Sequence, residues 1–147
     1  MSLVELIKQA NDLQPDFIAI NIFTTNYSLV KKFTQSIRFK THFIIGGLST
    51  KQLYSDILKW RTSHPIDIVT GDGERITPDI VKNQLQEAPF LAKGNRRVFI
   101  VDSKSKYEVK DIDVDVSNYH YIMIPVNAKQ RFRPIPALGV FLAAGPL

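Results

Sequence analysis

Three short segments of this sequence combine glycines or small polar side chains in the way that is typical of ligand-binding loops. They are Thr24-Thr25-Asn26, Gly46-Gly47 and Gly71-Asp72-Gly73-Glu74. Paired glycines allow a ligand to lie against the backbone without meeting a Cβ atom. Hydroxyl and carboxylate groups beside them can hydrogen-bond to a sugar hydroxyl or, equally, cap a helix. Taken one at a time, each segment is also explained as a turn or a helix cap.

The sequence lacks the residue patterns of the common catalytic sites. It has no cysteine, which excludes thiolate zinc sites, iron–sulfur ligation and cysteine nucleophiles. It has no Gly-x-Ser-x-Gly elbow and no phosphate loop, and its histidines are scattered as His42, His64 and His120. Asp111, Asp113 and Asp115 alternate along one strand face and are predicted to be solvated. We therefore predict no catalytic residue and no protein metal ligand, and leave open whether the protein is an enzyme.

The net charge of +5 raises the question of a nucleic-acid partner. The basic residues are dispersed along the sequence, with Lys31, Lys32 and Arg38 in a helical pattern and Arg96 and Arg97 before a strand. We interpret them as a solvated surface and predict no nucleic-acid partner. With neither a membrane span nor a secretory signal in the sequence, we expect a cytoplasmic protein with no membrane partner.

The spacing of apolar residues predicts an α/β fold. Short runs rich in β-branched residues suit strands buried on both faces, and they lie at Phe17 to Phe23, Phe43 to Ile45, Ile66 to Val69 and Val98 to Val101. Helical patterns lie between these runs. Ser2 with Glu5 predicts a capping box, and Thr77-Pro78 predicts another helix start. This order predicts a doubly wound, mainly parallel sheet of the Rossmann or flavodoxin type.

In such a sheet, ligands bind beyond the carboxyl ends of the strands. The three polar segments follow three successive predicted strands, so we expect their loops to meet in one binding site. We also expect that a leucine at Gly47 would block this site without disturbing the strands.

The two ends of the predicted sheet are unusual. The chain opens with a helix, as though the first strands of the fold were absent, and residues 91–147 read as a β-rich extension whose apolar tail, Ala137 to Leu147, has no evident partner. An uncovered apolar edge invites aggregation. We therefore expect the open side of the Phe17 to Phe23 strand to be covered by a segment within Arg96 to Val126 or by a second copy of the chain.

Residues 1–90 resemble a known family through three motifs in order. The motifs are Pro15-Asp16-Phe17-Ile18-Ala19-Ile20-Asn21-Ile22-Phe23-Thr24, Phe43-Ile44-Ile45-Gly46-Gly47 and Ile66-Asp67-Ile68-Val69-Thr70-Gly71-Asp72-Gly73-Glu74. Together they resemble the cobalamin-binding domain at the N-terminus of many radical S-adenosylmethionine enzymes.

The resemblance implies a corrinoid cofactor, cobalamin, with its nucleotide tail beside Gly46 and Gly47. Thr24 and Thr25 would border the tail, the Gly71 to Glu74 loop would close the pocket, and Asn21 stands where the family often has a serine.

The chain also departs from the family. Leu48 and Ser49 replace a common proline and histidine, and no Asp-x-His-x-x-Gly pattern supplies an axial ligand. The implied partners are the cofactor and either a homodimer or a downstream radical enzyme domain. The alternative is a regulatory or protein-interaction module that keeps the fold without the ligand.

Overall fold

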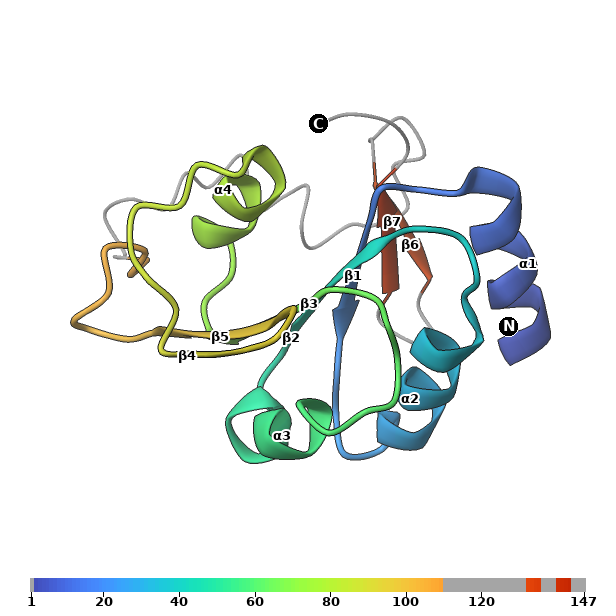
Figure 1. The fold of residues 1–147 in the computed structure, drawn as a ribbon, viewed down its shortest axis with the longest axis horizontal. Coiled ribbons are helices and arrows are strands. Elements are labelled where there is room, and N and C mark those ends of the chain that lie inside the picture. The colour runs from blue at the N-terminus through green and yellow to red at the C-terminus, as the bar shows by residue number, and fades with distance from the viewer. Residues whose placement is uncertain (1, 110–131, 136–139, 144–147) are drawn as a thin grey trace.

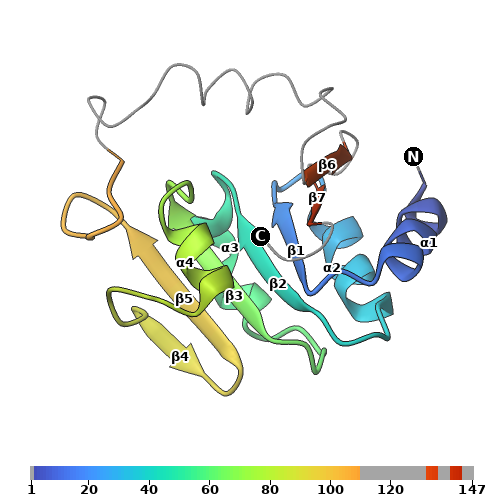
Figure 2. The ribbon, with the colours of Figure 1, turned by 90° about the horizontal axis from the view of Figure 1, so that it is seen from above.

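The computed structural model describes residues 2–109, 132–135 and 140–143, which form one mixed sheet with helices on both faces (Figures 1 and 2). The helices are α1 (Leu3–Leu13), α2 (Tyr27–Ser36), α3 (Thr50–Ile57) and α4 (Ile76–Lys82). The strands are β1 (Phe17–Asn21), β2 (His42–Gly46), β3 (Ile66–Gly71), β4 (Leu91–Lys93), β5 (Arg96–Val101), β6 (Phe132–Ile135) and β7 (Val140–Ala143). The predicted α/β class with a mostly parallel sheet is confirmed.

The sheet has the strand order β4-β5-β3-β2-β1-β7-β6. Its four central strands are parallel, with Ile18 beside Phe43, Phe43 beside Ile66, and Ile66 beside Arg96. The prediction that the first three apolar runs form adjacent parallel strands is therefore confirmed. The strand face predicted to carry Asp111, Asp113 and Asp115 lies outside the described residues.

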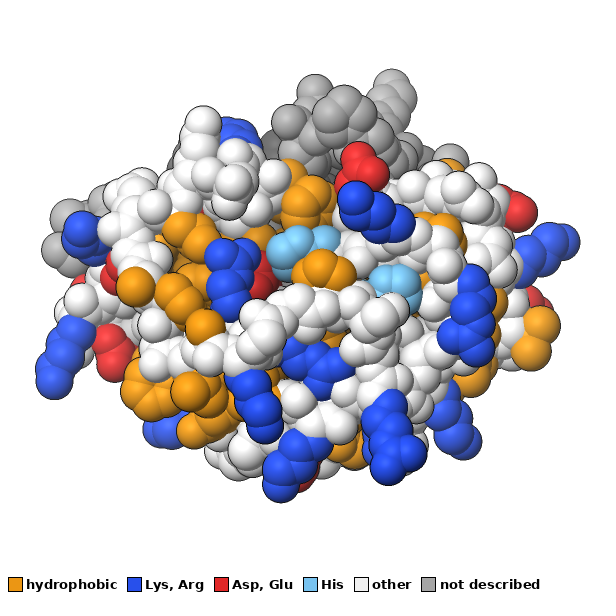
Figure 3. Space-filling view, in the orientation of Figure 1, with side chains coloured by type: hydrophobic (Ala, Val, Ile, Leu, Met, Phe, Trp, Pro, Cys, Tyr) orange, Lys and Arg blue, Asp and Glu red, His pale blue; other side chains and the backbone are white. Residues whose placement is uncertain are grey.

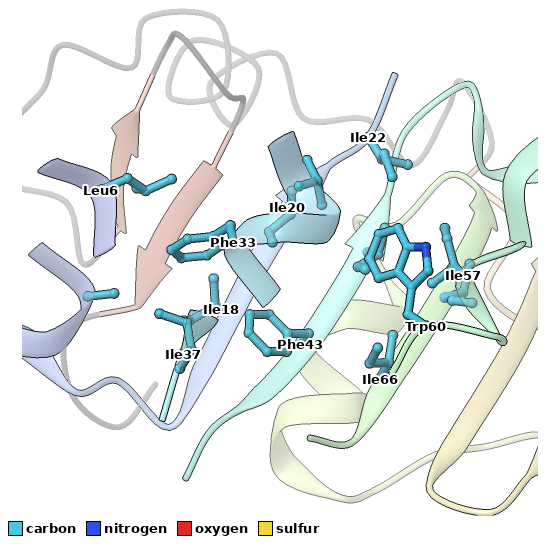
Figure 4. Packing of buried hydrophobic residues seen from close by; sticks show 14 of the residues in the cluster. Leu6, Ile18, Ile20, Ile22, Phe33, Ile37, Phe43, Ile57, Trp60 and Ile66 are labelled. Atoms are coloured by element: carbon cyan, nitrogen blue, oxygen red, sulfur yellow. The ribbon is translucent and has the colours of Figure 1, made fainter. Parts of the chain in front are cut away.

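Helices α1, α2 and α3 cover one face of the sheet and enclose the larger core (Figure 4). Alternate residues of the strands point into this core, as Ile18, Phe43 and Ile66 do, and all three are fully buried. Val30 and Phe33 of α2 pack against them, and the ring of Phe33 meets that of Phe43 edge to face. None of the helices in the described ranges is long and apolar enough to cross a bilayer.

Helix α4 lies on the opposite face and closes a second, smaller core with Ile44, Val69 and Phe99. The strand order nevertheless continues in the same direction from β3 to β5. The connection through α4 therefore has the opposite hand to those through α2 and α3. It includes the hairpin strand β4, so it is not a direct strand–helix–strand unit to which the right-handed rule applies.

One of the two predicted helix starts is correct. Ser2 and Glu5 form the capping box, in which the Ser2 side chain accepts from the Glu5 backbone and the Glu5 side chain accepts from Ser2. The prediction at Thr77-Pro78 is wrong, because α4 already begins at Ile76. The Thr77 backbone donates to the carbonyl of Gly73, so the turn begins in the preceding loop.

The open side of β1 is covered by β7, which pairs with it antiparallel and places Ile20 opposite Val140. The expectation of a covering segment from later in the chain is therefore confirmed, but its location within Arg96 to Val126 is wrong. The apolar tail that had no evident partner in the sequence supplies this strand. Its neighbour β6 then forms the outer edge of the sheet.

The interpretation of Arg96 as a solvated residue is wrong. Its side chain is 8% exposed and donates to the carbonyls of Leu58 and Thr62, both at 2.7 Å, where α3 ends. A helix leaves its last carbonyls unpaired, and a guanidinium satisfies several of them at once. Burial of this group lowers the pKa of Arg96 from its usual value.

Arg97 was also expected to be solvated, and it instead forms a salt bridge with Asp67, a carboxylate only 1% exposed in the central strand β3. Both carboxylate oxygens of Asp67 accept from Arg97 at 2.7 Å, and His42 Nε2 lies 2.9 Å from one of them. Burial alone would raise the pKa of Asp67, but the hydrogen bonds and charges of His42 and Arg97 hold it below the usual value.

We predict that Asp67→Asn lowers the free energy of unfolding by about 2 kcal/mol at pH 7, because it removes the charge that balances Arg97 inside the sheet. A carboxylate with a depressed pKa stabilises the fold above its unfolded-state pKa, and this contribution is lost as the pH falls. Urea unfolding should therefore show the difference between parent and variant shrinking below about pH 4. Asp56→Asn, at an exposed position of α3, is the control and should change stability little; equal losses in the two variants would contradict the assignment.

Candidate functional site

The candidate site lies at the carboxyl ends of β1, β2 and β3. Asn21 and Gly46 are register partners at the ends of β1 and β2. By strand alternation both belong to the sheet face that α4 covers farther along, the same face as Ala19 and Ile44. Asn21 is exposed, and Ala19 and Gly46 are half-exposed, so small side chains form a partly open strip on this face.

Backbone and side-chain hydrogen bonds hold the three loops together. The Ile22 backbone donates to the carbonyl of Gly46 at 2.8 Å, which extends the β1–β2 pairing beyond the strands. The hydroxyl of Thr50 lies 2.8 Å from the carbonyl of Gly47 and 3.1 Å from that of Val69, which links the loop after β2 to β3. The sequence-based expectation that the three loops leave neighbouring strands at one edge is confirmed.

The four glycines of the site differ in what the fold requires of them. Gly47 has φ +112°, and a Cβ atom there would lie 2.9 Å from the carbonyl oxygen of Ile22. Gly71 has φ +91°, and a Cβ atom there would collide with the carbonyl of Val101. Both positions therefore need glycine for packing and backbone conformation.

Gly46 and Gly73 are not constrained in this way. A Cβ atom at Gly46 would meet nothing closer than the Val69 carbonyl at 3.9 Å, and one at Gly73 would make ordinary contact with Thr77 at 3.4 Å. The expectation that a leucine at Gly47 would leave the strands undisturbed is therefore wrong, because it would push into the Ile22 backbone. Gly46 is the position beside it where a Cβ atom would be accepted without a clash.

The remaining residues of the predicted site lie at its rim. Thr24, Thr25, Asp72 and Glu74 are all exposed. Neither threonine hydroxyl is hydrogen-bonded within the part of the chain that the structure describes. The 71–74 loop leads into α4, and Gly73 accepts from the backbone of Thr77 at 3.0 Å.

The sequence analysis placed Asn26 in the loop after β1, but it missed two apolar residues at this edge. Asn26 shapes the turn after β1, since its side chain accepts from the Phe23 backbone at 2.7 Å and donates to the Asn21 carbonyl at 3.1 Å. Phe23 and Leu48 are apolar but 40% and 90% exposed. Phe23 follows Ile22, and Leu48 follows Gly47. Because the backbones of Ile22 and Gly47 lie close together, Phe23 and Leu48 flank the site. The only signal in the sequence for these two residues was that an apolar residue lies two positions beyond the end of each strand.

The described residues form no cluster of side chains that could hold a metal ion at this site. No group of three or more acidic or histidine side chains with suitable spacing occurs among them. His42 begins β2 and His64 precedes β3, so both lie at the amino-terminal edge, the side of the molecule seen in Figure 3. His120 lies outside the described residues.

Comparison of the chain with protein-family models, with curated proteins and with solved structures gave no match. The function is therefore argued from the geometry of the site and from the motifs of the sequence.

The difference between the glycines yields a stability prediction. Gly47→Ala and Gly71→Ala should each lower the free energy of unfolding by about 2 kcal/mol or more, because alanine is strained at their φ angles and its Cβ meets backbone atoms. Gly46→Ala should change it by less than about 0.5 kcal/mol. Urea denaturation of the three variants measures the ranking, and a loss at Gly46 equal to that at Gly47 would show that Gly46 is also required by the fold.

Proposed function

We propose that this chain is a cobalamin-binding-type module that positions a corrinoid cofactor over the carboxyl edge of its sheet. On the family resemblance, it is the N-terminal part or a divergent relative of a radical S-adenosylmethionine enzyme. The cofactor and a further domain would supply the chemistry, while the residues of this chain would bind and orient the corrinoid.

The observation that carries this proposal is the room for a Cβ atom at Gly46. The fold does not require a glycine there, since this atom would make only ordinary van der Waals contact, with the Val69 carbonyl at 3.9 Å. A ligand that must lie against the backbone does require one. The resemblance places the nucleotide tail of cobalamin beside this glycine pair, so the residues at the site fit a tail lying over Gly46.

Asn21 supports the same placement. It is the register partner of Gly46, and its exposed amide can both donate and accept a hydrogen bond. An amide can thus take the hydrogen-bonding role of the serine that the family often has here. Ala19, on the same face of β1, adds no bulk to the strip.

The histidine motif is the clearest difference from the family. Neither described histidine lies at the carboxyl edge, and the chain lacks that motif. We propose that the residues at this edge would hold a corrinoid without a histidine ligand from the described residues.

Phe23 and Leu48 favour a second candidate function. Two exposed apolar side chains beside one loop contact also suit a protein partner that covers the edge. In this alternative, the chain is a regulatory or interaction module that keeps the fold without the cofactor.

We predict that hydroxocobalamin binds to the parent chain with a change in its visible spectrum. Gly46→Leu should weaken this binding at least tenfold, because the leucine side chain occupies the space of the nucleotide tail, while thermal stability stays close to that of the parent. The same substitution should weaken the binding of cobinamide much less, because cobinamide lacks the nucleotide. Spectral titration of both corrinoids measures the two effects.

Ala92→Leu is the matched control, since it adds a similar side-chain volume at an exposed position of β4, far from the site. It should bind like the parent. If the parent gives no spectral change, or if Gly46→Leu binds hydroxocobalamin as tightly as the parent, the cofactor proposal is wrong and the interaction module becomes the better account.

A further inference from the structure

The positive charge of the chain is concentrated in one structural layer. Residues 27–62, which contain α2, β2 and α3, carry seven Lys and Arg side chains and a single acidic residue, Asp56. The rest of the chain is almost neutral, because the net charge of the whole is only +5. We call these seven side chains the basic layer: Lys31, Lys32, Arg38, Lys40, Lys51, Lys59 and Arg61.

The fold brings this layer together on one side of the molecule. Helices α2 and α3 pack on the same sheet face, since Phe33 and Ile57 belong to one core cluster. The loops that follow the two helices are in direct contact, with His64 Nε2 2.8 Å from the Ile37 carbonyl. Figure 3 shows Lys and Arg side chains gathered over α2 and α3.

The cations of the layer are exposed and lack partner charges. Six of the seven are exposed and Lys31 is half-exposed. Among the described residues, the only ion pairs are those of Asp67, so no carboxylate there neutralises the layer. Cations near helix C-termini stabilise the helix, which accounts for Arg38, whose guanidinium donates to the Gln35 carbonyl at 2.8 Å. Lys40, Lys59 and Arg61 make no such bond with any residue that the structure describes.

We propose that the basic layer binds the phosphate backbone of a nucleic acid without reading its sequence. The proposal is independent of any cofactor at the carboxyl edge. In the sequence the basic residues are dispersed, which favoured a merely solvated surface. In the fold, the seven side chains of the basic layer lie on one side of the molecule. Phosphate contacts need cations but no apolar contact, and they supply most of non-specific nucleic-acid affinity.

The composition of the surface argues against other polyanions. A membrane-binding surface or a protein interface also needs exposed apolar side chains. Five of the large exposed apolar residues of the described chain lie outside residues 27–62: Val4 and Leu13 on α1, Phe90 and Leu91 at β4, and Phe23 after β1. The sixth, Leu48, lies within that range, in the loop between β2 and α3 at the carboxyl edge. Stacking on single-stranded bases would need exposed aromatic rings, and the aromatic residues of the segment 27–62 are buried or half-buried.

The test measures binding of a fluorescent, mixed-sequence DNA duplex of about 20 base pairs by anisotropy over a series of salt concentrations. We compare the full chain with the triple variant Lys40→Gln, Lys59→Gln, Arg61→Gln. The control triple, Lys82→Gln, Lys93→Gln, Lys104→Gln, removes the same charge from exposed positions outside the layer. An RNA duplex and vesicles of anionic phospholipid serve as further probes.

We expect the layer variant to lose about tenfold or more in affinity at low salt. The slope of its log affinity against log salt should become less steep by about 2 to 3. The control triple should bind nearly like the parent, and circular dichroism should show all three proteins equally folded. Equal weakening by both triples would reduce the effect to net charge and overturn the proposal. It would also be overturned if the parent bound neither duplex, or bound vesicles and not the duplexes.

Discussion

The buried carboxylate of Asp67 is the interaction on which the centre of the sheet depends. It lies in β3, between β2 and β5, and its neutralisation by Arg97 with the contact to His42 links all three strands on one face. An unpaired charge at this depth would cost several kcal/mol. The charge of Asp67 is therefore neutralised only when these three strands pair in the correct register. A shift of β3 by one residue would move Asp67 into the apolar core on the other face.

The parallel core was readable from the sequence because its signals are local. Short β-branched runs at regular spacing, with amphipathic helices between them, have few other interpretations, and Ser2 with Glu5 marks a helix start directly. Arg96 and Arg97 were misread for the opposite reason. Their roles depend on a helix end and a carboxylate some thirty residues away, and an arginine pair before a strand looks the same in sequence whether it is solvated or buried.

The candidate site shows the same division between local and distant information. Sequence order predicted which loops meet, since parallel strands bring their carboxyl ends to one edge. It did not show which glycine the fold requires, because Gly46 and Gly47 are neighbouring residues of the same type. Only the approach of the Ile22 backbone shows that Gly47 is required by packing, whereas a Cβ atom at Gly46 would make only ordinary contact. The exposed Phe23 and Leu48 were hidden for a related reason, because an apolar letter at a strand end is normally read as core.

The pairing of β1 with β7 has a consequence for how the chain acquires its structure. Strand β1 leaves the ribosome well before its antiparallel neighbour, which comes from residues 140–143. Contacts between such distant segments form slowly, because a long loop must close before any pairing energy is gained. The backbone of β1 would therefore stay unpaired on that side while β2, β3 and β5 are already assembled. A nascent chain in that condition offers a binding edge to chaperones, and to other nascent copies of itself.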